Sequence, residues 1–440
     1  MERTLINELN CHLNQEVKIQ GWIQNIRAQK NMVFVILRDH TGLAQVVLER
    51  ALNSELADKV CNTAKESAVT IQGLAIKNEI VKLMGLEVQL REIEVNGPSD
   101  NQLPFDLFGP SDCYPDLDVR MDWRFLDLRK PENLLIFKMQ TSAEWAMREY
   151  WNRENFIEIH SPKFIGTASE SGAELFAVEY FGKMAYLAQS PQFYKQMAMS
   201  AGFNKVFEIG PVFRANPSFT SRHDTEFTSV DVEMSWIQSH EDVMSFEERW
   251  LQYIFKVIKE KHEQELLERY KVPVEVPEVP FPRIKMAEAM EILKSQGYTN
   301  IGPKSDLDPE GERLICKYTK EKYNSDFVFV IDYPKEVRPF YHMRYDRDPE
   351  ITKSFDLLWK GLELTTGAQR EHRYEILKNQ VLEKKLKTEP LQFYLDFFKY
   401  GCPPHGGYGF GLTRMLMILL NLKNVREVTY LYRGPNRLSP

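Results

Sequence analysis

The first hundred residues carry the alternation of apolar and polar side chains that is typical of β-strands. Residues 17–23 alternate with a period of two, and short apolar runs follow at 33–37, 45–48 and 69–73. A stretch from about 51 to 65 interrupts this pattern and predicts a helix. Several short strands separated by turn-forming residues predict a small barrel or sandwich in this part of the chain.

Five strands with one helix between them fit an OB-fold, which binds oligonucleotides on one face. Chain breakers then accumulate over residues 97–117, where glycine or proline occurs at positions 97, 98, 104, 109, 110 and 115. Such a stretch without periodicity reads as a linker. We therefore expect an OB-fold domain over residues 1–97, a hinge or linker over 98–120 and a second domain over 121–440.

The second domain mixes long helices with short strands. A helix is predicted from about 131 to 155, followed by a strand at 156–159. A second long helix begins at Ser239, which has capping-box spacing to Asp242 and precedes an apolar stripe. Prolines exclude regular helix from residues 271–281. The remaining pattern predicts strands at 327–332 and 355–364 and helices at about 307–320, 370–385, 390–399 and 409–421.

Composition narrows the class of protein. The 440 residues are 43% hydrophobic and 27% charged, which is ordinary for a globular protein. The net charge of −7 makes a wholly basic nucleic-acid coat protein improbable but allows RNA binding by a local patch. Five dispersed cysteines without CxxC spacing suggest reduced thiols and a cytoplasmic protein. No apolar run approaches the ~18 residues of a membrane span, so we expect no membrane association.

Three segments carry more chemistry than packing requires. The first runs from 206 to 234, where two apolar strands flank a polar loop with Arg214, Arg222 and His223. Cations on such a loop can grip a phosphate. A surface hairpin with solvated charges explains this segment alone about equally well.

The second segment runs from 354 to 370 and contains Glu363 and Thr366. In a regular strand these two side chains point to opposite faces. The run ends at Gly367, where a loop could return Thr366 to the side of Glu363. A carboxylate with a hydroxyl suits a hard cation such as Mg²⁺, with phosphates completing the shell. Taken alone, a single glutamate on a strand is more often simply solvated.

The third segment is glycine-rich, from His405 to Arg414, and leads into an apolar helix. Glycines allow a ligand to approach the backbone closely, and an arginine just inside the helix can reach a phosphate. The spacing matches neither the dinucleotide-binding fingerprint nor the phosphate-binding loop with Gly-Lys-Ser/Thr. By itself this glycine-rich segment is a weak signal.

Three motifs in this order resemble those of class II aminoacyl-tRNA synthetases. They are Phe-Arg on a hairpin at 213–214, Glu-x-x-Thr-Gly at 363–367 and Gly-x-Gly-x-Gly-x-x-Arg at 407–414. With the barrel, the chain resembles the aspartyl/asparaginyl/lysyl subgroup, and Pro162 falls where that class has its dimer-interface motif. Within the subgroup it is most similar to aspartyl-tRNA synthetases of the compact archaeal type, because the catalytic part leaves no room for the bacterial insertion. The supporting segments are 190–196, 338–341, 367–372 and 399–407.

The resemblance implies an α+β protein, with an OB-fold β-barrel followed by a class II catalytic domain built on an antiparallel sheet flanked by helices. It also implies a homodimer that forms aspartyl-adenylate from L-aspartate and ATP with Mg²⁺ and transfers aspartate to tRNA. In-line chemistry at a phosphate depends mainly on positioning and charge neutralisation.

The resemblance also implies a role for individual residues. Arg214 would hold the α-phosphate as the catalytic residue, Phe227 would stack on adenine, and Glu363 with Thr366 would bind Mg²⁺. The other ATP-binding positions would be Arg222, His223, Gly409, Gly411 and Arg414.

In the amino-acid pocket, Arg370 would fork onto the β-carboxylate of aspartate, beside Lys195. The α-ammonium group would meet Glu170, Gln192 and Asp231. A pocket with two buried cations should reject asparagine strongly, because a neutral amide leaves the cations under-compensated.

In the barrel, the anticodon-reading positions would be Arg27, Phe34 and Gln45. Phe34 lies in a Val-Phe-Val run, so without the resemblance a place in the barrel core would be preferred.

Two acids expected from the resemblance are missing near the ATP site. Asn216 stands where most close relatives have glutamate, and Thr413 stands where most have an acid before the arginine. Two alternatives therefore stay open. One is an asparaginyl-tRNA synthetase, which Lys195 and segment 338–341 disfavour. The other is a synthetase-like paralogue that activates an amino acid for a non-tRNA acceptor or acts in regulation.

Overall fold

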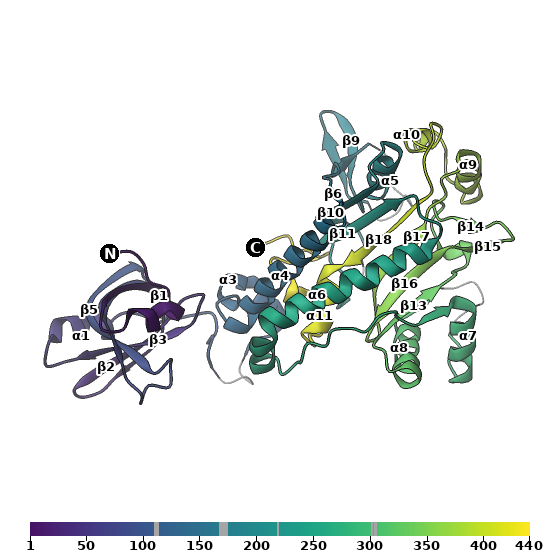
Figure 1. Cartoon of the computed structure of the whole chain (residues 1–440). Helices are drawn as coiled ribbons and strands as arrows, with labels where there is room; N and C mark the ends of the chain where they lie inside the picture. Colours follow the sequence, from purple (N-terminus) through teal and green to yellow (C-terminus); the bar gives the residue numbers. More distant parts are fainter. Residues whose placement is uncertain (110–113, 167–174, 218–219, 301, 303–305) are drawn as a thin grey trace. The chain divides into compact units, whose positions relative to one another are not determined.

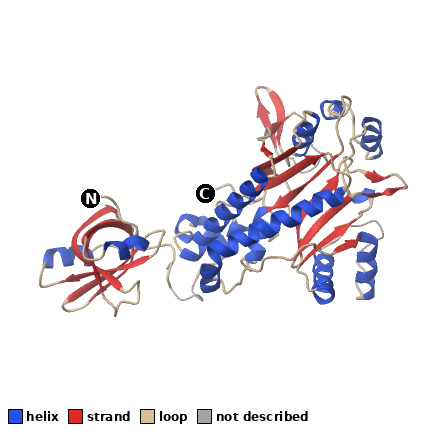
Figure 2. Ribbon diagram, viewed as in Figure 1, coloured by secondary structure: helices blue, strands red, loops and turns tan. Residues whose placement is uncertain are grey.

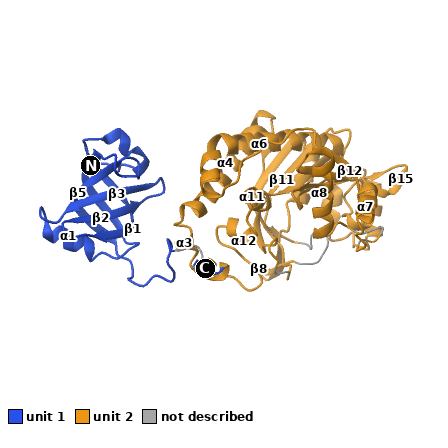
Figure 3. Cartoon of the chain, turned by 90° about the horizontal axis from the view of Figure 1, so that it is seen from below, with its two compact units in different colours: residues 1–116 blue, residues 117–440 orange. Residues whose placement is uncertain are grey.

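The computed structural model describes residues 1–109, 114–166, 175–217, 220–300, 302 and 306–440. The chain divides into two compact units, Met1–Asp116 and Leu117–Pro440 (Figure 3). Among the described residues, the helices are all too short or too polar to span a membrane. The four cysteines within these residues are unpaired, and Cys113 lies outside them.

Unit 1 is a closed five-stranded barrel with strand order β1-β2-β3-β5-β4, as the OB-fold prediction requires. Alternate side chains point inward, so that Val33, Val35 and Leu37 are buried. A 3₁₀ helix, η1 (Ile6–His12), precedes the barrel and was not predicted. The barrel elements are β1 (Glu16–Ala28), β2 (Met32–Arg38), β3 (Leu43–Glu49), α1 (Ser54–Cys61), β4 (Ala68–Lys77) and β5 (Leu86–Gly97).

The beginning of the predicted linker packs on the barrel. The backbone N–H of Ser99 donates to Ser67 Oγ at 3.0 Å. The guanidinium of Arg38 lies 4.8 Å from the ring centre of Phe108. These contacts explain why the compact unit reaches residue 116, beyond the end of the last barrel strand.

Unit 2 is built on an eight-stranded sheet with order β12-β13-β16-β17-β18-β11-β10-β6 (Figures 1 and 2). Its centre is antiparallel as expected, but the edge pairs β12/β13 and β10/β6 are parallel, so the sheet is mixed. The sheet strands are β6 (Ile157–Glu158), β10 (Lys205–Phe213), β11 (Glu226–Ser235), β12 (Arg283–Lys285), β13 (Phe327–Ile331), β16 (Ser354–Trp359), β17 (Leu362–Gln369) and β18 (His405–Gly411).

Two long helices, α4 (Pro131–Arg153) and α6 (His240–Arg269), pack on each other, and α6 lies against β17 and β18 (Figure 1). The predicted capping box at the start of α6 is confirmed, because Ser239 and Asp242 exchange side chain-to-backbone bonds. Buried aromatic residues link helices to sheet: Trp151 of α4 stacks on Trp250 of α6 and on Phe207 of β10. This core holds the sheet that carries the candidate site.

Two predicted elements differ from the structure. The strand predicted over 355–364 is a hairpin, because the chain reverses at Lys360 and Gly361, both with positive φ. The glycine-rich segment forms the central strand β18, for which no strand was predicted, and the helix predicted from about 409 begins only after it, as α11 (Leu412–Leu419). A Cβ at Gly407 would lie 2.0 Å from the carbonyl oxygen of Val232, so the neighbouring strand requires glycine there.

Smaller elements surround this sheet. Residues 271–281 contain no regular element, as the prolines predicted. The helices are α2 (Leu117–Asp122), α3 (Arg124–Asp127), α5 (Gln192–Ser200), α7 (Met286–Ser295), α8 (Pro309–Tyr323), η3 (Lys335–Val337), α9 (Tyr374–Glu383), α10 (Gln392–Asp396) and α12 (Val425–Val428). Two small sheets comprise β7 (Phe164–Ile165), β8 (Ala177–Tyr180) and β9 (Lys183–Leu187), and β14 (Arg344–Tyr345) with β15 (Asp348–Thr352).

Candidate active site

A cavity of about 380 Å³ lies over the centre of the sheet, between β11, β17 and β18 and the chain that joins β10 to β11. It brings together most of the predicted site residues, although they come from segments far apart in the sequence. Lys195 lies buried beneath it, and Glu170 lies outside the described residues. The predicted residues that line it are Gln192, Arg214, Arg222, His223, Phe227, Asp231, Glu363, Thr366, Arg370, Gly409, Gly411 and Arg414.

Strand register explains how the floor of the cavity forms. Gly409 of β18 lies between Asp231 of β11 and Thr366 of β17, as their paired Cα positions show. A Cβ at Gly409 would lie 3.4 Å from Asp231 Oδ1, which is an ordinary contact distance. The neighbouring strand would therefore not clash with a side chain here, and the glycine leaves open space above the strand. A strand without side chains at this point gives a ligand access to the backbone.

A β-bulge places the predicted magnesium pair on one face. Leu357 pairs with Thr365, but the next residue, Leu358, pairs with Glu363, so Leu364 is an extra residue in β17. The bulge cancels the alternation that would separate Glu363 from Thr366. The Thr366 hydroxyl donates to Glu363 Oε1 at 3.3 Å. The predicted loop at Gly367 is wrong, since β17 continues to Gln369.

The donor set of this pair fits a magnesium ion that is shared with a nucleotide. Carboxylate and hydroxyl oxygens are the ligands that Mg²⁺ prefers, and it commonly binds through one or two protein groups plus phosphates. Among the described residues, no group of three or more His, Cys, Asp or Glu side chains lies close enough together to hold a metal ion. Mg²⁺ at this pair would therefore complete its shell with phosphate or water oxygens.

Several cations and one additional acid surround the pair Glu363 and Thr366. Arg414 Nη1 bonds to the Glu363 carboxylate at 3.2 Å and to the carbonyl oxygen of Glu363 at 2.9 Å. Arg222 Nη1 lies 3.2 Å from Glu312 Oε2, a carboxylate on α8 that the sequence analysis missed. Burial and the nearby Glu363 raise the pKa of Glu312 to about 7, although Arg222 and Arg414 oppose this rise. The Arg214 guanidinium lies 5.2 Å from the ring centre of Phe227.

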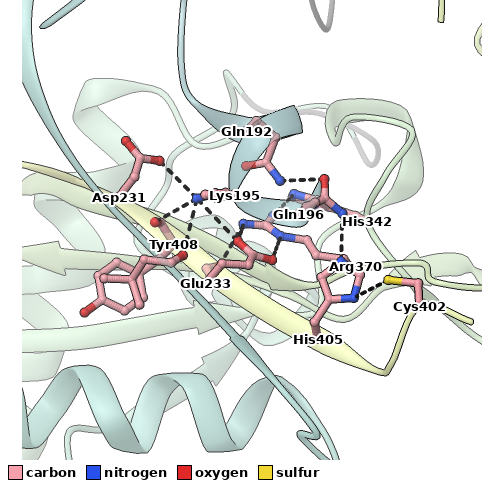
Figure 4. A network of polar contacts seen from close by, with 12 residues as sticks. Gln192, Lys195, Gln196, Asp231, Glu233, His342, Arg370, Cys402, His405 and Tyr408 are labelled. Atoms are coloured by element: carbon pink, nitrogen blue, oxygen red, sulfur yellow. Dashed lines mark hydrogen bonds and ion pairs between the residues drawn. The ribbon is translucent and has the colours of Figure 1, made fainter. Parts of the chain in front are cut away.

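A buried ionic network forms the other end of the site (Figure 4). Lys195 Nζ bonds to Asp231 Oδ1 and to the carbonyl oxygen of Tyr408, both at 3.0 Å, and lies 3.5 Å from Glu233 Oε2. Arg370 pairs with both oxygens of Glu233, through Nε at 3.0 Å and Nη2 at 3.3 Å. Burial alone would raise the pKa of Glu233, but Arg370 and Lys195 lower it below its ordinary value.

This network changes the expected role of Arg370. Its two-nitrogen fork faces Glu233, so a substrate carboxylate would meet the remaining Nη1 side rather than the fork. Nη1 lies 3.1 Å from His342 Nε2, and because arginine only donates, this imidazole nitrogen accepts the bond. Burial and Arg370 lower the pKa of His342 well below its ordinary value, so the ring stays neutral.

Glu233, His342 and Glu312 were not predicted as site residues. A signal existed for Glu233, because it follows Asp231 by two residues on a strand and therefore shares its face. His342 and Glu312 gave no comparable signal, since only the folded chain brings them to Arg370 and Arg222.

The predicted tRNA-contacting residues lie on the barrel of unit 1. Val33 and Val35 are buried, whereas Phe34 between them is half-exposed on the outer face. Phe34 is therefore not part of the barrel core. Arg27 pairs with it across the strands, and its guanidinium lies 4.9 Å from the Phe34 ring centre. Gln45 Nε2 donates to Glu87 Oε2 at 3.1 Å.

The mixed sheet with an antiparallel centre, the Phe-Arg hairpin and the glycine strand leading into a helix define a class II synthetase fold. A family model described as tRNA synthetases class II (D, K and N) matches residues 116–433. A second, described as OB-fold nucleic acid binding domain, matches residues 17–96. The chain thus belongs to the aspartate, lysine and asparagine family of class II tRNA synthetases.

Individual relatives extend over nearly the whole chain. The aspartate–tRNA(Asp) ligase of Pyrococcus abyssi is 42% identical and covers 99% of this chain and 98% of its own. The aspartate–tRNA(Asp/Asn) ligase of Methanopyrus kandleri is 44% identical and covers 97% of this chain and 96% of its own. Among solved structures, asparaginyl-tRNA synthetase from Pyrococcus horikoshii with asparaginyl-adenylate has a TM-score of 0.91 at 30% identity, covering 100% of both chains. Aspartyl-tRNA synthetase from Entamoeba histolytica has a TM-score of 0.89 at 32% identity, and the match covers 100% of this chain and 93% of its own.

Proposed function

We propose that this chain is an aspartate–tRNA ligase, which forms aspartyl-adenylate from aspartate and ATP and transfers aspartate to tRNA. The observation that carries the amino-acid choice is the buried network around Lys195 and Arg370. Glu233 compensates Arg370, while Asp231 bonds to Lys195 and would also accept from the α-ammonium of the substrate. One positive charge then remains for the β-carboxylate, which aspartate has and asparagine lacks.

In this proposal ATP binds along the other half of the cavity. Phe227 stacks on adenine, while Arg222, His223 and Arg414 meet the outer phosphates and Gly409 and Gly411 let the nucleotide approach β18. Glu363 and Thr366 would hold Mg²⁺, which neutralises phosphate charge when it is bound. Arg214 binds the α-phosphate and stabilises the negative charge that develops as the aspartate α-carboxylate attacks it.

The remaining assignments complete the proposal. Gln192 and Glu170 join Asp231 at the α-ammonium, and the barrel reads the tRNA anticodon through Arg27, Phe34 and Gln45. Exposed aromatic and cationic groups on a barrel face suit stacking with unpaired bases. We further propose that the protein is cytoplasmic and forms a homodimer. The homodimer is supported by exposed apolar side chains such as Phe164, which follow the segment around Pro162 that resembles the dimer motif of the class.

Arg214→Ala tests the assignment of the reaction centre. Losing a positioned charge at the α-phosphate should reduce aspartate-dependent ATP–pyrophosphate exchange by about 100-fold or more. The matched control is Arg91→Ala, which removes an exposed arginine from β5 and should leave exchange unchanged. Near-normal exchange by the Arg214 variant would overturn the assignment.

A second candidate is an asparaginyl enzyme, because one solved structure with a high TM-score carries asparaginyl-adenylate. The relative from Methanopyrus kandleri, named for both tRNAs, raises a separate question about tRNA choice. Both are addressed by charging separate tRNA-Asp and tRNA-Asn transcripts with aspartate and with asparagine. We expect aspartate on tRNA-Asp. Charging by asparagine would favour the second candidate, and exchange without any tRNA charging would favour a paralogue with another acceptor.

A further inference from the structure

We infer that Glu312 of α8 is a positioning residue for the nucleotide end of the site, where it holds Arg222 and the backbone of Glu363 in place. This inference rests on the proposed function, in which Arg222 meets ATP phosphates and Glu363 helps to hold Mg²⁺. Glu312 lies 90 residues from Arg222 and 51 from Glu363 in the sequence, so only the fold brings them together.

One carboxylate oxygen makes both contacts. Glu312 Oε2 lies 3.2 Å from Arg222 Nη1 and 3.4 Å from the backbone nitrogen of Glu363. Glu363 in turn bonds to Arg414 and accepts from Thr366. Glu312 therefore connects the loop between β10 and β11 to the bulged part of β17, and indirectly to α11.

The helix keeps this carboxylate in place. The Asp308 side chain caps α8, accepting from the backbone N–H of Gly311 at 2.8 Å and of Glu310 at 3.1 Å. Glu312 sits in the first turn, where the helix dipole favours a negative charge. It is only 8% exposed, unlike the surface ion pairs that contribute little to stability.

The local charge balance suggests why such a residue is useful here. Two cations, Arg222 and Arg414, face two carboxylates, Glu312 and Glu363. Without Glu312, Arg222 would lose its partner at this end and would be drawn to the Glu363 carboxylate, where it would compete with Mg²⁺. Asn216 and Thr413 line the same cavity and carry no charge that could replace Glu312.

Glu312→Gln, measured at pH 8 where the Glu312 carboxyl is mostly ionised, tests this inference by removing the charge while keeping the shape and an oxygen acceptor. The main measurement is binding of MgATP to the full chain by titration calorimetry, which does not depend on the amino acid that is activated. We expect Kd for MgATP to rise about 5- to 20-fold, which corresponds to a weakened charge-assisted hydrogen bond. The Mg²⁺ concentration that gives half-maximal exchange should rise as well, while KM for aspartate stays unchanged.

Two further variants separate positioning from a general structural role. Glu310→Gln removes an exposed carboxylate from the same helix turn and should leave Kd for MgATP unchanged. In an Arg222→Ala background, Glu312→Gln should add much less than it does alone, because both residues belong to one contact.

Unchanged MgATP binding by Glu312→Gln would overturn the inference. Equal losses of ATP and aspartate affinity with a lowered Tm would also overturn it, because they would show a structural role. If the wild type binds MgATP but exchanges no aspartate, the proposed function fails, and the Kd comparison still decides the role of Glu312.

Discussion

At the scale of single residues, the side chains around Phe227 and Glu363 hold one another in place. Arg214 lies over the Phe227 ring, and Arg414 and Thr366 both bond to Glu363. A cation over an aromatic face is worth about 0.5–2 kcal/mol. In the proposed complex, adenine would need a face of the Phe227 ring that the Arg214 guanidinium does not cover.

Phe227→Leu should raise KM for ATP while changing KM for aspartate little. Leucine keeps an apolar side chain but loses the flat surface, and a base stacked on an aromatic ring contributes about 1–3 kcal/mol. The expected rise is therefore about 5- to 100-fold, measured by ATP–pyrophosphate exchange at saturating aspartate. A rise in both KM values would indicate a distorted cavity, and no rise would show that adenine binds elsewhere.

At the scale of elements, the bulge in β17 and the absence of side chains on β18 shape the site. Four of the five barrel strands, the hairpin at Phe213 and Arg214 and the start of α6 were predicted, because period-two alternation and capping residues are local signals. No run of residues was assigned to the fifth barrel strand, β5. The bulge at Leu364 and the strand β18 were not predicted. A bulge depends on the partner strand, and glycines read locally as a loop even where a neighbouring strand requires them. The contacts of Glu312 with Arg222 and of His342 with Arg370 could not be predicted either, because only the folded chain brings these residues together.

The packing of α6 on β17 contains a buried carboxyl group that makes stability depend on pH. Thr365 donates its hydroxyl to Glu247 Oε1 at 2.6 Å, while Glu247 Oε2 is buried without a hydrogen-bond partner. Burial raises the pKa of Glu247 to about 8, which the Thr365 bond partly opposes and Glu248 reinforces. The folded state therefore keeps a proton that the unfolded chain releases near its ordinary pKa of 4.5.

Because the pKa of Glu247 is raised in the folded state, its protonated carboxyl contributes its full share to the free energy of unfolding below about pH 4.5. This contribution is lost as the pH rises towards 8. From pH 6 to pH 8 this group should lower the free energy of unfolding by about 1 kcal/mol per pH unit. Glu247→Gln should remove this slope, because glutamine offers a similar donor and acceptor without titrating. Urea unfolding at pH 6, 7 and 8 measures it, with exposed Glu260→Gln on the same helix as control. An unchanged slope in Glu247→Gln would show that Glu247 is ionised in the fold.

At the scale of the whole molecule, each unit has its own core, and each carries one part of the proposed function. The barrel core and the core of the large sheet are separate clusters. The net charge of −7 means that tRNA contact depends on local cationic and aromatic groups rather than on overall attraction. Changes on one unit should therefore affect one step of the reaction.

The proposed homodimer predicts a specific effect of Phe164→Asp. The Phe164 side chain is 55% exposed on β7, next to the segment around Pro162, and an aspartate there would be unfavourable in an apolar interface. We expect a shift towards monomer in light scattering at micromolar concentration. Ile80→Asp, which changes a 90% exposed apolar residue in unit 1, should leave the dimer intact. An unchanged mass for the Phe164 variant would place the interface elsewhere.

Phe34→Ala tests whether the barrel serves tRNA recognition alone. Because Phe34 lies outside the barrel core, its loss should not unfold unit 1. Because the proposed adenylate site is formed by residues of unit 2, ATP–pyrophosphate exchange should stay normal. Loss of one stacked base should raise KM for tRNA about 5- to 100-fold, measured by aminoacylation of a tRNA-Asp transcript. Val33→Ala offers the contrast, since it opens a cavity in the barrel core and should lower thermal stability. Normal tRNA KM in Phe34→Ala would remove this residue from the proposed anticodon site, whereas weakened exchange would mean that the two units are coupled during amino-acid activation.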